Sequence, residues 1–199
     1  MPKAFSQREK ELIHNKLLET GKALIRTFGI KKTNVEDLTR SAGISKGAFY
    51  LFYQSKEELF LEVLEIYEKE LQHELLQIIA APGTDAKQSF IATMKKAISI
   101  VESSSMMKLL SKEELAYLQR KMPEEKMKEN MENDFYFIQQ FIEKLREQYS
   151  FKEFDLNNVI GVVKAIFFLS LEKENFGLDL YPYTIDTLLE MLAGYMIKE

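Results

Sequence analysis

Residues 33–59 read TNVEDLTRSAGISKGAFYLFYQSKEEL, and this stretch decides the fold of the first part of the chain. A helix is expected to open at Thr33 or Asn34. Thr33 and Glu36 have the Ser/Thr-x-x-Glu spacing of a capping box, in which two side chains satisfy free amide groups at a helix start. Gly43 predicts the end of this helix, because glycine adopts the left-handed conformation of a helix cap without a Cβ clash. Apolar residues recur between them at the spacing of one helix face: Val35, Leu38 and Ala42.

A second short helix is expected at about 46–53, with Ser45 as its cap. Lys46 places a cation at the start of this helix, where free amide groups attract phosphate. Ser55 and Glu58 form another capping box and predict the start of a third helix. Two amphipathic helices joined by a tight turn are typical of a helix-turn-helix, whose second helix faces base edges in the major groove of DNA.

A dense pattern runs through this stretch and the residues just before it: Gly29, Thr33, Val35, Leu38, Ala42, Gly43, Ile44, Ser45, Lys46, Gly47, Phe49, Tyr50, Tyr53, Ser55, Lys56, Glu57, Glu58 and Leu59. It resembles the TetR family of one-component transcriptional regulators over roughly the first third of the chain. The resemblance implies a homodimer with an N-terminal three-helix DNA-binding domain and a C-terminal bundle that binds a small molecule and dimerises. Leu51 and Phe52 depart from the family pattern, which often has His or Tyr at these positions.

Carried over residue by residue, the resemblance implies DNA contacts from Thr33, Ser45, Lys46, Gly47, Tyr50 and Lys56. Asn34, at the start of the first helix of the pair, is a further candidate. The implied partners are double-stranded operator DNA, a second copy of the chain and a small-molecule effector. No cofactor and no metal are expected.

Helical patterns continue outside this stretch. Ser6 and Glu9 form a capping box that opens a first helix, and Gly29 is expected to end it. A long helix is expected from Ser55 to about Ile79, before a break that two consecutive turn-forming residues predict at Pro82 and Gly83. Later helices are expected at about 84–102, 106–121, 123–149, 155–174 and 182–197.

The fold class is therefore all-α, with about nine helices and no run of strand periodicity. Pro123 and Pro182 support two of the later helix starts, because a proline at the first helical position loses no hydrogen bond. We expect a DNA-binding domain at 1–54 and a helical ligand-binding and dimerisation domain at 55–199.

The charge of the chain is unevenly distributed along its length. The net charge is −4, but residues 1–56 hold 11 Lys and Arg against 5 Asp and Glu, a net +6, which leaves −10 for the remainder. A basic first segment attracts phosphate whatever the DNA sequence, and the acidic remainder does not. The alternative is chance clustering of charge in a helical protein.

No segment predicts secretion or a membrane anchor. The first residues, MPKAFSQREKE, are polar, and the longest apolar run, Val159–Leu171, has 13 residues with Lys164 inside it. About 20 apolar residues are needed to cross a bilayer. The chain has no Cys, so disulfides and thiolate metal sites are excluded. We expect a cytoplasmic protein with no membrane partner.

The last two helices are candidates for a dimer interface, because they combine apolar side chains with small residues that permit close approach. The candidate residues are Ile160, Gly161, Lys164, Ala165, Phe168, Leu188, Leu192 and Tyr195. Two such helices from each subunit form a four-helix interface. The alternative is that these positions face the core of the chain itself.

A ligand pocket is expected in the helical bundle, among its aromatic and methionine side chains. The candidates are Met94, Met106, Met107, Phe135, Ile138, Phe141, Phe167 and Phe168. Each of them is also compatible with an ordinary core position. If a subset lines a cavity, the ligand is largely apolar.

Two other functional classes compete with DNA binding. Residues 43–47, Gly-Ile-Ser-Lys-Gly, match the Gly-x-Ser-x-Gly pattern of a hydrolase nucleophile, which requires the Ser on a strand-to-helix turn followed by an acid and a His. The Ser here follows a predicted helix, and the only downstream histidine is His73, so we do not expect an enzyme. A helical interaction protein that does not bind DNA is the other alternative.

The expected function is ligand-responsive binding of a palindromic operator by a dimer, with repression as the commoner outcome in the family. The two recognition helices of such a dimer lie about one helical turn of DNA apart. A ligand that favours another tilt of the long helix from Ser55 changes this separation and lowers the affinity for DNA.

Overall fold

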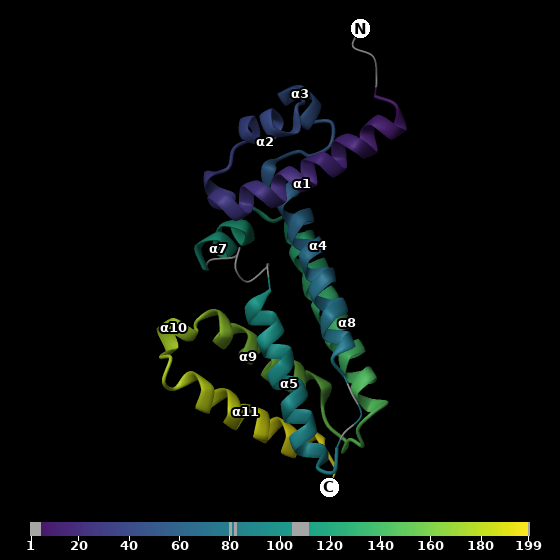
Figure 1. Ribbon diagram of the computed structural model, residues 1–199, viewed down its shortest axis with the longest axis vertical. Helices are drawn as coiled ribbons and strands as arrows, with labels where there is room; N and C mark the ends of the chain where they lie inside the picture. The colour runs from purple at the N-terminus through teal and green to yellow at the C-terminus, as the bar shows by residue number, and fades with distance from the viewer. Residues whose placement is uncertain (1–4, 80, 82, 105–111, 199) are drawn as a thin grey trace. The chain divides into compact units, whose positions relative to one another are not determined.

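The computed structural model describes residues 5–79, 81, 83–104 and 112–198 (Figure 1). These residues form ten helical segments: α1 (Gln7–Lys32), α2 (Val35–Ala42), α3 (Lys46–Phe49), α4 (Lys56–Gln77), α5 (Ala86–Ser103), α7 (Lys112–Lys121), α8 (Glu124–Arg146), α9 (Leu156–Leu171), α10 (Lys173–Phe176) and α11 (Tyr181–Met196). Over the same residues the only strand-like pairing is one antiparallel bridge, between Phe151 and Ile197. The prediction of an all-α fold is confirmed.

The chain divides into two compact units. Unit 1 comprises 1–69 and 108–123, and unit 2 comprises 70–107 and 124–199. The division falls inside α4, and it places α7 with the first three helices. The functional boundary expected between residues 54 and 55 remains a prediction, and the two units are described separately below.

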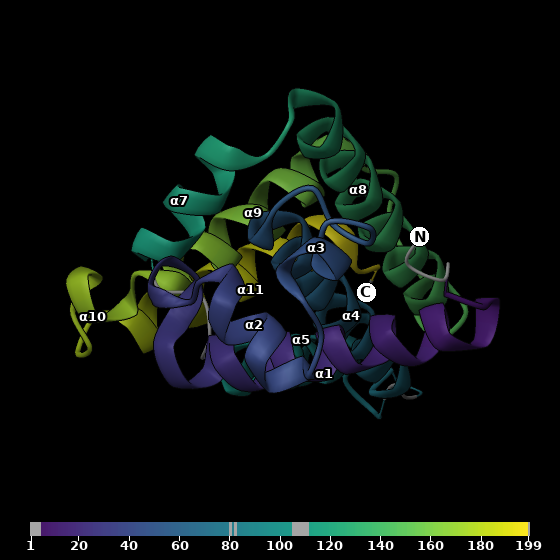
Figure 2. The same cartoon turned by 90° about the horizontal axis from the view of Figure 1, so that it is seen from above.

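Unit 1 begins with the helix whose start and end were both expected. The Ser6 hydroxyl accepts from the amide of Glu9, and the Glu9 carboxylate accepts from the amide of Ser6, so this capping box is confirmed. Gly29 has φ 76° and ψ 173° and interrupts the helix, although one further turn continues to Lys32. Figures 1 and 2 both show α2 lying across the C-terminal half of α1.

Of the two starts expected for α2, at Thr33 or Asn34, the structure has the second. Asn34 is the cap, and its side-chain oxygen accepts from the amide of Asp37 at 2.9 Å. The capping box expected at Thr33 and Glu36 is therefore wrong, because Thr33 is buried and its hydroxyl donates to the carbonyl of Gly29. Gly43 ends the helix at φ 68° and ψ 35°, as expected.

The second helix of the pair is shorter than expected. Ser45 caps it as predicted, accepting from the amide of Ala48 at 3.1 Å, but α3 ends at Phe49. Tight turns then follow, in which Leu51 donates to the Ala48 carbonyl and Phe52 donates to the Phe49 carbonyl. The polypeptide between 49 and 53 is therefore compact without being a regular α-helix.

Each unit has its own apolar core. In unit 1, the fully buried side chains are Leu17, Ile30, Leu38, Phe49, Leu59, Phe60 and Val63. Gly21 lets α1 approach α4 closely, because a Cβ at this position would lie 3.3 Å from a methyl group of Val63. Burial of these side chains is the main force that holds α1, α3 and α4 together.

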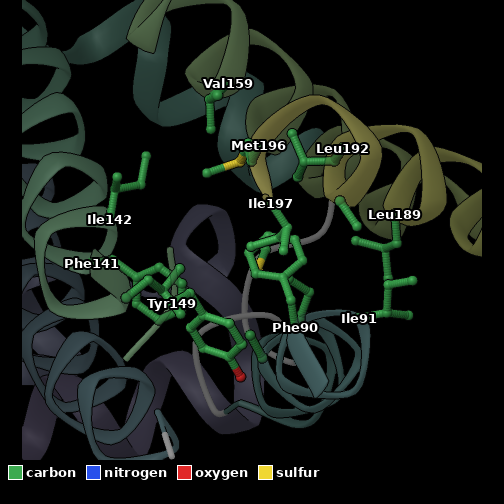
Figure 3. Close-up of a cluster of buried hydrophobic side chains, with 14 of the residues drawn as sticks. Phe90, Ile91, Phe141, Ile142, Tyr149, Val159, Leu189, Leu192, Met196 and Ile197 are labelled. Atoms are coloured by element: carbon green, nitrogen blue, oxygen red, sulfur yellow. The ribbon is translucent and has the colours of Figure 1, made fainter. Parts of the chain in front are cut away.

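Unit 2 is built on a larger core, drawn in Figure 3. Phe90 of α5 meets Tyr149 and Phe151 edge-to-face at 6.0 and 6.5 Å between ring centroids. Leu189 and Ile197 are also fully buried there. The bridge at Phe151 ties the α8–α9 connection to the end of α11, through the bond from the amide of Lys152 to the carbonyl of Met196 at 2.7 Å.

The helices of unit 2 follow the predicted order, with one difference near the end. One helix was expected up to residue 174, but α9 ends at Leu171 and a separate short helix, α10, follows it. Gly177, with φ 110°, ends α10. Pro182 lies in the first turn of α11, as expected. Among the helices that the structure describes, none combines the length and the hydropathy of a membrane span.

Candidate nucleic-acid interface

The short helix α3 has one buried side and one exposed side. Phe49 is fully buried and Ala48 nearly so. Lys46, Gly47 and Tyr50 are exposed, and half of the Tyr50 side chain is accessible. The same helix turn therefore anchors α3 in unit 1 and presents a cation, a bare backbone and a phenol outward.

Lys46 forms an ion pair with Glu36, which connects the start of α3 to the first turn of α2. The hydrogen bond and the attraction between the two groups raise the pKa of the Lys46 ammonium. The same hydrogen bond lowers the pKa of the Glu36 carboxyl. Both side chains are about half exposed, so a phosphate can compete with Glu36 for the ammonium.

Replacement of Glu36 by Gln is expected to strengthen binding to a random-sequence duplex by about two- to fivefold, because it frees Lys46 and removes one repulsive charge. The matched control is Asp37→Asn, which removes a carboxylate that pairs with Arg40 in the same helix. Fluorescence anisotropy at low and high salt measures both variants. The prediction fails if the two variants bind equally well, or if the difference survives at high salt.

Two of the predicted DNA contacts lie inside unit 1. Thr33 is 1% exposed and bonds to Gly29. The Lys56 ammonium donates to the carbonyls of Ile30, Lys31 and Thr33 at 2.9, 3.1 and 2.7 Å. Lys56 therefore satisfies carbonyl acceptors at the end of α1, a role that the sequence did not predict.

The two capping residues, Asn34 and Ser45, are exposed, but a side-chain oxygen of each accepts from the helix that it caps. The structure thus gathers the exposed candidates on α3 and at the start of α2. Leu51, which departs from the family pattern, is 72% exposed and adds an apolar group beside Tyr50.

A polar cluster that involves Tyr53, just after α3, was also not predicted from the sequence. The Tyr53 hydroxyl donates to Glu62 of α4 at 2.8 Å, and Nε2 of His14 on α1 lies 3.0 Å from the other carboxylate oxygen. The His14 ring stacks on Tyr53 at 5.8 Å. Burial and the neighbouring Glu62 raise the pKa of Tyr53. This cluster joins α1, the end of the α3 segment and α4.

The hydrolase pattern at residues 43–47 has no catalytic geometry. Ser45 follows a helix and a left-handed glycine instead of a strand, and its hydroxyl is occupied as a helix cap. Within the described part of the chain, no group of three or more His, Asp or Glu is arranged to hold a metal ion.

Six of the predicted pocket residues lie on three helices of unit 2. Met94 of α5 and Phe141 of α8 belong to its buried core, and Ile138 packs against it. Phe167 is half-buried, whereas Phe135 and Phe168 are exposed. Met106 and Met107 lie outside the described residues. A ligand pocket among these side chains remains a prediction.

The predicted interface residues separate onto two sides of their helices. Gly161, Ala165 and Phe168 form an exposed stripe on α9. Tyr195 is also exposed, and Lys164 and Leu188 are partly exposed. Ile160 and Leu192 are buried within unit 2, which favours the core alternative for these two.

Unit 2 also contains a polar cluster, which no pattern in the sequence predicted. The Tyr181 hydroxyl donates to Glu102 at 2.6 Å and lies 2.8 Å from the buried Ser170 hydroxyl. Lys173 lies 3.5 Å from Glu102. Burial and the bond to Glu102 raise the pKa of Tyr181 to about 12. The cluster joins α5, α9, α10 and α11.

The part of the chain that contains the helix-turn-helix is similar to known proteins. Residues 17–63 match the family described as bacterial regulatory proteins, tetR family. The HTH-type transcriptional regulator YuxN of Bacillus subtilis is 38% identical over 60 residues, which are 30% of this chain and 20% of that protein. The HTH-type transcriptional repressor KstR2 of Rhodococcus jostii is 25% identical over 117 residues, 59% of this chain and 57% of that protein. The chain therefore matches about a fifth and somewhat over half of the length of these two relatives.

Solved structures share the fold over nearly the whole chain. A TetR-family transcriptional regulator from Pectobacterium atrosepticum has a TM-score of 0.66 at 19% identity and covers 94% of each chain. SmeT, the repressor of the Stenotrophomonas maltophilia multidrug efflux pump SmeDEF, has a TM-score of 0.57 at 16% identity, over 94% of this chain and 91% of that one. SmeT has also been solved as a complex with triclosan.

Proposed function

We propose that the chain, whose residues 17–63 match the tetR family of bacterial regulatory proteins, is a transcriptional repressor that binds a palindromic operator as a dimer and releases it on binding a small, largely apolar ligand. The family is one of regulators and not of enzymes, which removes the hydrolase alternative. The site of action is the cytoplasm, where bacterial DNA is accessible.

One observation carries this proposal: α3 is anchored by the buried Phe49 and presents Lys46, Gly47 and Tyr50 outward within the segment that matches the family. A recognition helix requires such a division between a buried and an exposed side. Lys46 supplies a charge for phosphate and Tyr50 supplies a hydroxyl and an aromatic face. The exposed residues Asn34 and Ser45 cap the starts of α2 and α3.

A dimer through α9 and α11 follows from the exposed side of these helices. Beside the stripe on α9, α11 exposes Met191 at 67% and Tyr195 at 41%. A Cβ added at Gly161 or Gly194 would meet nothing within 4 Å, so another chain has room to approach both helices closely. An apolar stripe that is interrupted by glycine suits packing against a second copy of the same helices.

The double variant Phe168→Glu and Met191→Glu is expected to convert the dimer into a monomer, because it places charges in an apolar interface. Both side chains are exposed in the single chain, so the fold is retained. The control is Tyr136→Glu on α8, where the replaced side chain is 61% exposed. Sedimentation equilibrium and circular dichroism measure mass and helix content. A double variant that remains dimeric contradicts this interface.

The effector part of the proposal rests on the fold that the chain shares with SmeT, which binds triclosan. Met94 of α5 and the aromatic side chains of α8 and α9 are the groups offered to such a ligand. An apolar ligand fits this composition, because its binding is governed by the burial of apolar surface.

Selection of duplexes from a random pool by the full chain tests the proposal directly. We expect a palindromic consensus whose affinity falls steeply with salt. A screen of apolar compounds against the selected complex then identifies those that release the DNA. Failure to enrich any sequence refutes DNA recognition and favours the alternative of a helical interaction protein. Turnover of a simple ester that is lost in Ser45→Ala restores the hydrolase alternative.

A further inference from the structure

The connection between α1 and α2 is held by charged side chains on both sides of its backbone. The helix breaks at Gly29, so the amides that follow lose partners one turn back. Glu114 of α7 accepts from the amides of Ile30 and Lys31 at 3.1 and 3.3 Å. On the other side, Lys56 donates to the carbonyls of the same two residues at 2.9 and 3.1 Å. A carboxylate thus satisfies the donors and an ammonium satisfies the acceptors of one short segment.

Other side chains of α7 lie on the same part of unit 1. The Tyr117 hydroxyl donates to Glu57 at the start of α4, and its ring centroid lies 5.7 Å from the Lys56 ammonium. The bond to Glu57 and burial raise the pKa of Tyr117 to about 12. Glu113 lies 3.6 Å from the ammonium of Lys31, although its side chain is 84% exposed. These contacts fix α7 beside the end of α1 and the start of α4.

The fit of Glu114 against Gly29 is close. A Cβ built on Gly29 would lie 2.6 Å from a carboxylate oxygen of Glu114, well inside van der Waals contact. The positive φ of Gly29 favours glycine, and a Cβ at this position would also displace the carboxylate of Glu114. Along the chain, α7 lies between α5 and α8, which both belong to unit 2.

We propose that Glu114 is a positioning residue for DNA binding, which fixes the α1–α2 connection and through it the orientation of α2 and α3. This inference rests on the proposed DNA-binding function and adds to it a residue more than 50 positions beyond the helix-turn-helix. Hydrogen bonds from backbone amides to a carboxylate are charge-assisted and stronger than neutral ones. Without them, a smaller fraction of the protein has the geometry that fits DNA, and the apparent Kd rises in proportion.

The test compares Glu114→Ala with Glu113→Ala in the full chain. The two variants remove the same charge from neighbouring positions of α7, but only Glu114 accepts from backbone amides of α1. We expect Glu114→Ala to raise the Kd for the selected duplex about tenfold. In the same variant, hydrogen exchange at the amides of Ile30 and Lys31 should accelerate by about tenfold. Glu113→Ala should change either quantity by less than about twofold.

A rescue variant separates positioning from general stability. Glu114→Gln keeps an acceptor oxygen and should restore the affinity to within about threefold of the original chain. If the Ala variant does not fold, Glu114→Asp, whose acceptor is one methylene shorter, takes its place.

The inference is overturned if Glu114→Ala binds the selected duplex as tightly as the original chain, or if Glu113→Ala weakens binding as much. It is also overturned if exchange at Ile30 and Lys31 is unchanged. If the original chain enriches no duplex at all, it is the proposed function that fails, and the exchange measurement still decides whether Glu114 fixes the connection.

Discussion

Phe49→Ala is expected to lower the free energy of unfolding by about 3–5 kcal/mol, the range for removal of a fully buried Phe side chain. Phe49 is 0% exposed, and its ring contacts Tyr50 edge-to-face at 5.4 Å and Tyr53 at 5.8 Å. A protein of this size should lose roughly 2–4 °C of Tm for each kcal/mol. Thermal and urea unfolding, followed by circular dichroism, measure the change.

The control for this substitution is Phe28→Ala, which makes the same chemical change on α1. Phe28 is 56% exposed, so its removal should change the free energy of unfolding by no more than about 0.5 kcal/mol. Because Phe49 is the anchor of α3, the affinity for the selected duplex should fall in Phe49→Ala and remain in Phe28→Ala. Equal stability losses in the two variants would show that Phe49 does not anchor the helix.

The double variant Lys46→Ala and Tyr50→Ala is expected to weaken operator binding by about 25- to 100-fold, and each single variant by about five- to tenfold. Both side chains are exposed, so the fold should be retained. Lys46→Ala should reduce the slope of log K against log salt by about one, because one phosphate contact is lost. Tyr50→Ala should leave this slope unchanged. Anisotropy titrations over a range of salt concentrations give both quantities.

Lys69→Ala is the matched control for the loss of one positive charge. Lys69 is exposed on α4, thirteen residues beyond the start of that helix. At 1.5 Å per residue it lies about 20 Å along the helix, beyond the reach of a phosphate bound at α3. Its removal should barely change affinity. Unchanged binding in Lys46→Ala and in Tyr50→Ala would refute the placement of the DNA interface on α3.

Local sequence signals predicted the helices of unit 1 where a cap or a glycine acts within one turn. Ser6 with Glu9, Gly43 and Ser45 all have the predicted roles. The sequence left the start of α2 open between Thr33 and Asn34, because both residues are good caps. Burial of Thr33 decides between them, and burial depends on the helices packed around it.

The sites were less predictable, because their contacts join residues that are distant in sequence. Lys56 has the exposed-cation signature of a phosphate ligand, but its carbonyl partners lie 23 to 26 positions earlier. Glu102 and Tyr181 meet across 79 positions, and no spacing rule links them. On α9 and α11 the helical period identified two faces, and only packing showed that Leu192 faces inward and Met191 outward.

The contacts of α7 also limit how this protein can be recombined with its relatives. A chimera that takes only residues 1–54 leaves behind Glu114 and Tyr117, together with the Lys56 that holds the carbonyl side of the α1–α2 connection. If the foreign part of the chimera has no carboxylate at the position of Glu114, the amides of Ile30 and Lys31 beside the break at Gly29 lose their acceptor. The helix-turn-helix of this chain is therefore not a portable module by itself, and a working graft has to include α7 with the start of α4.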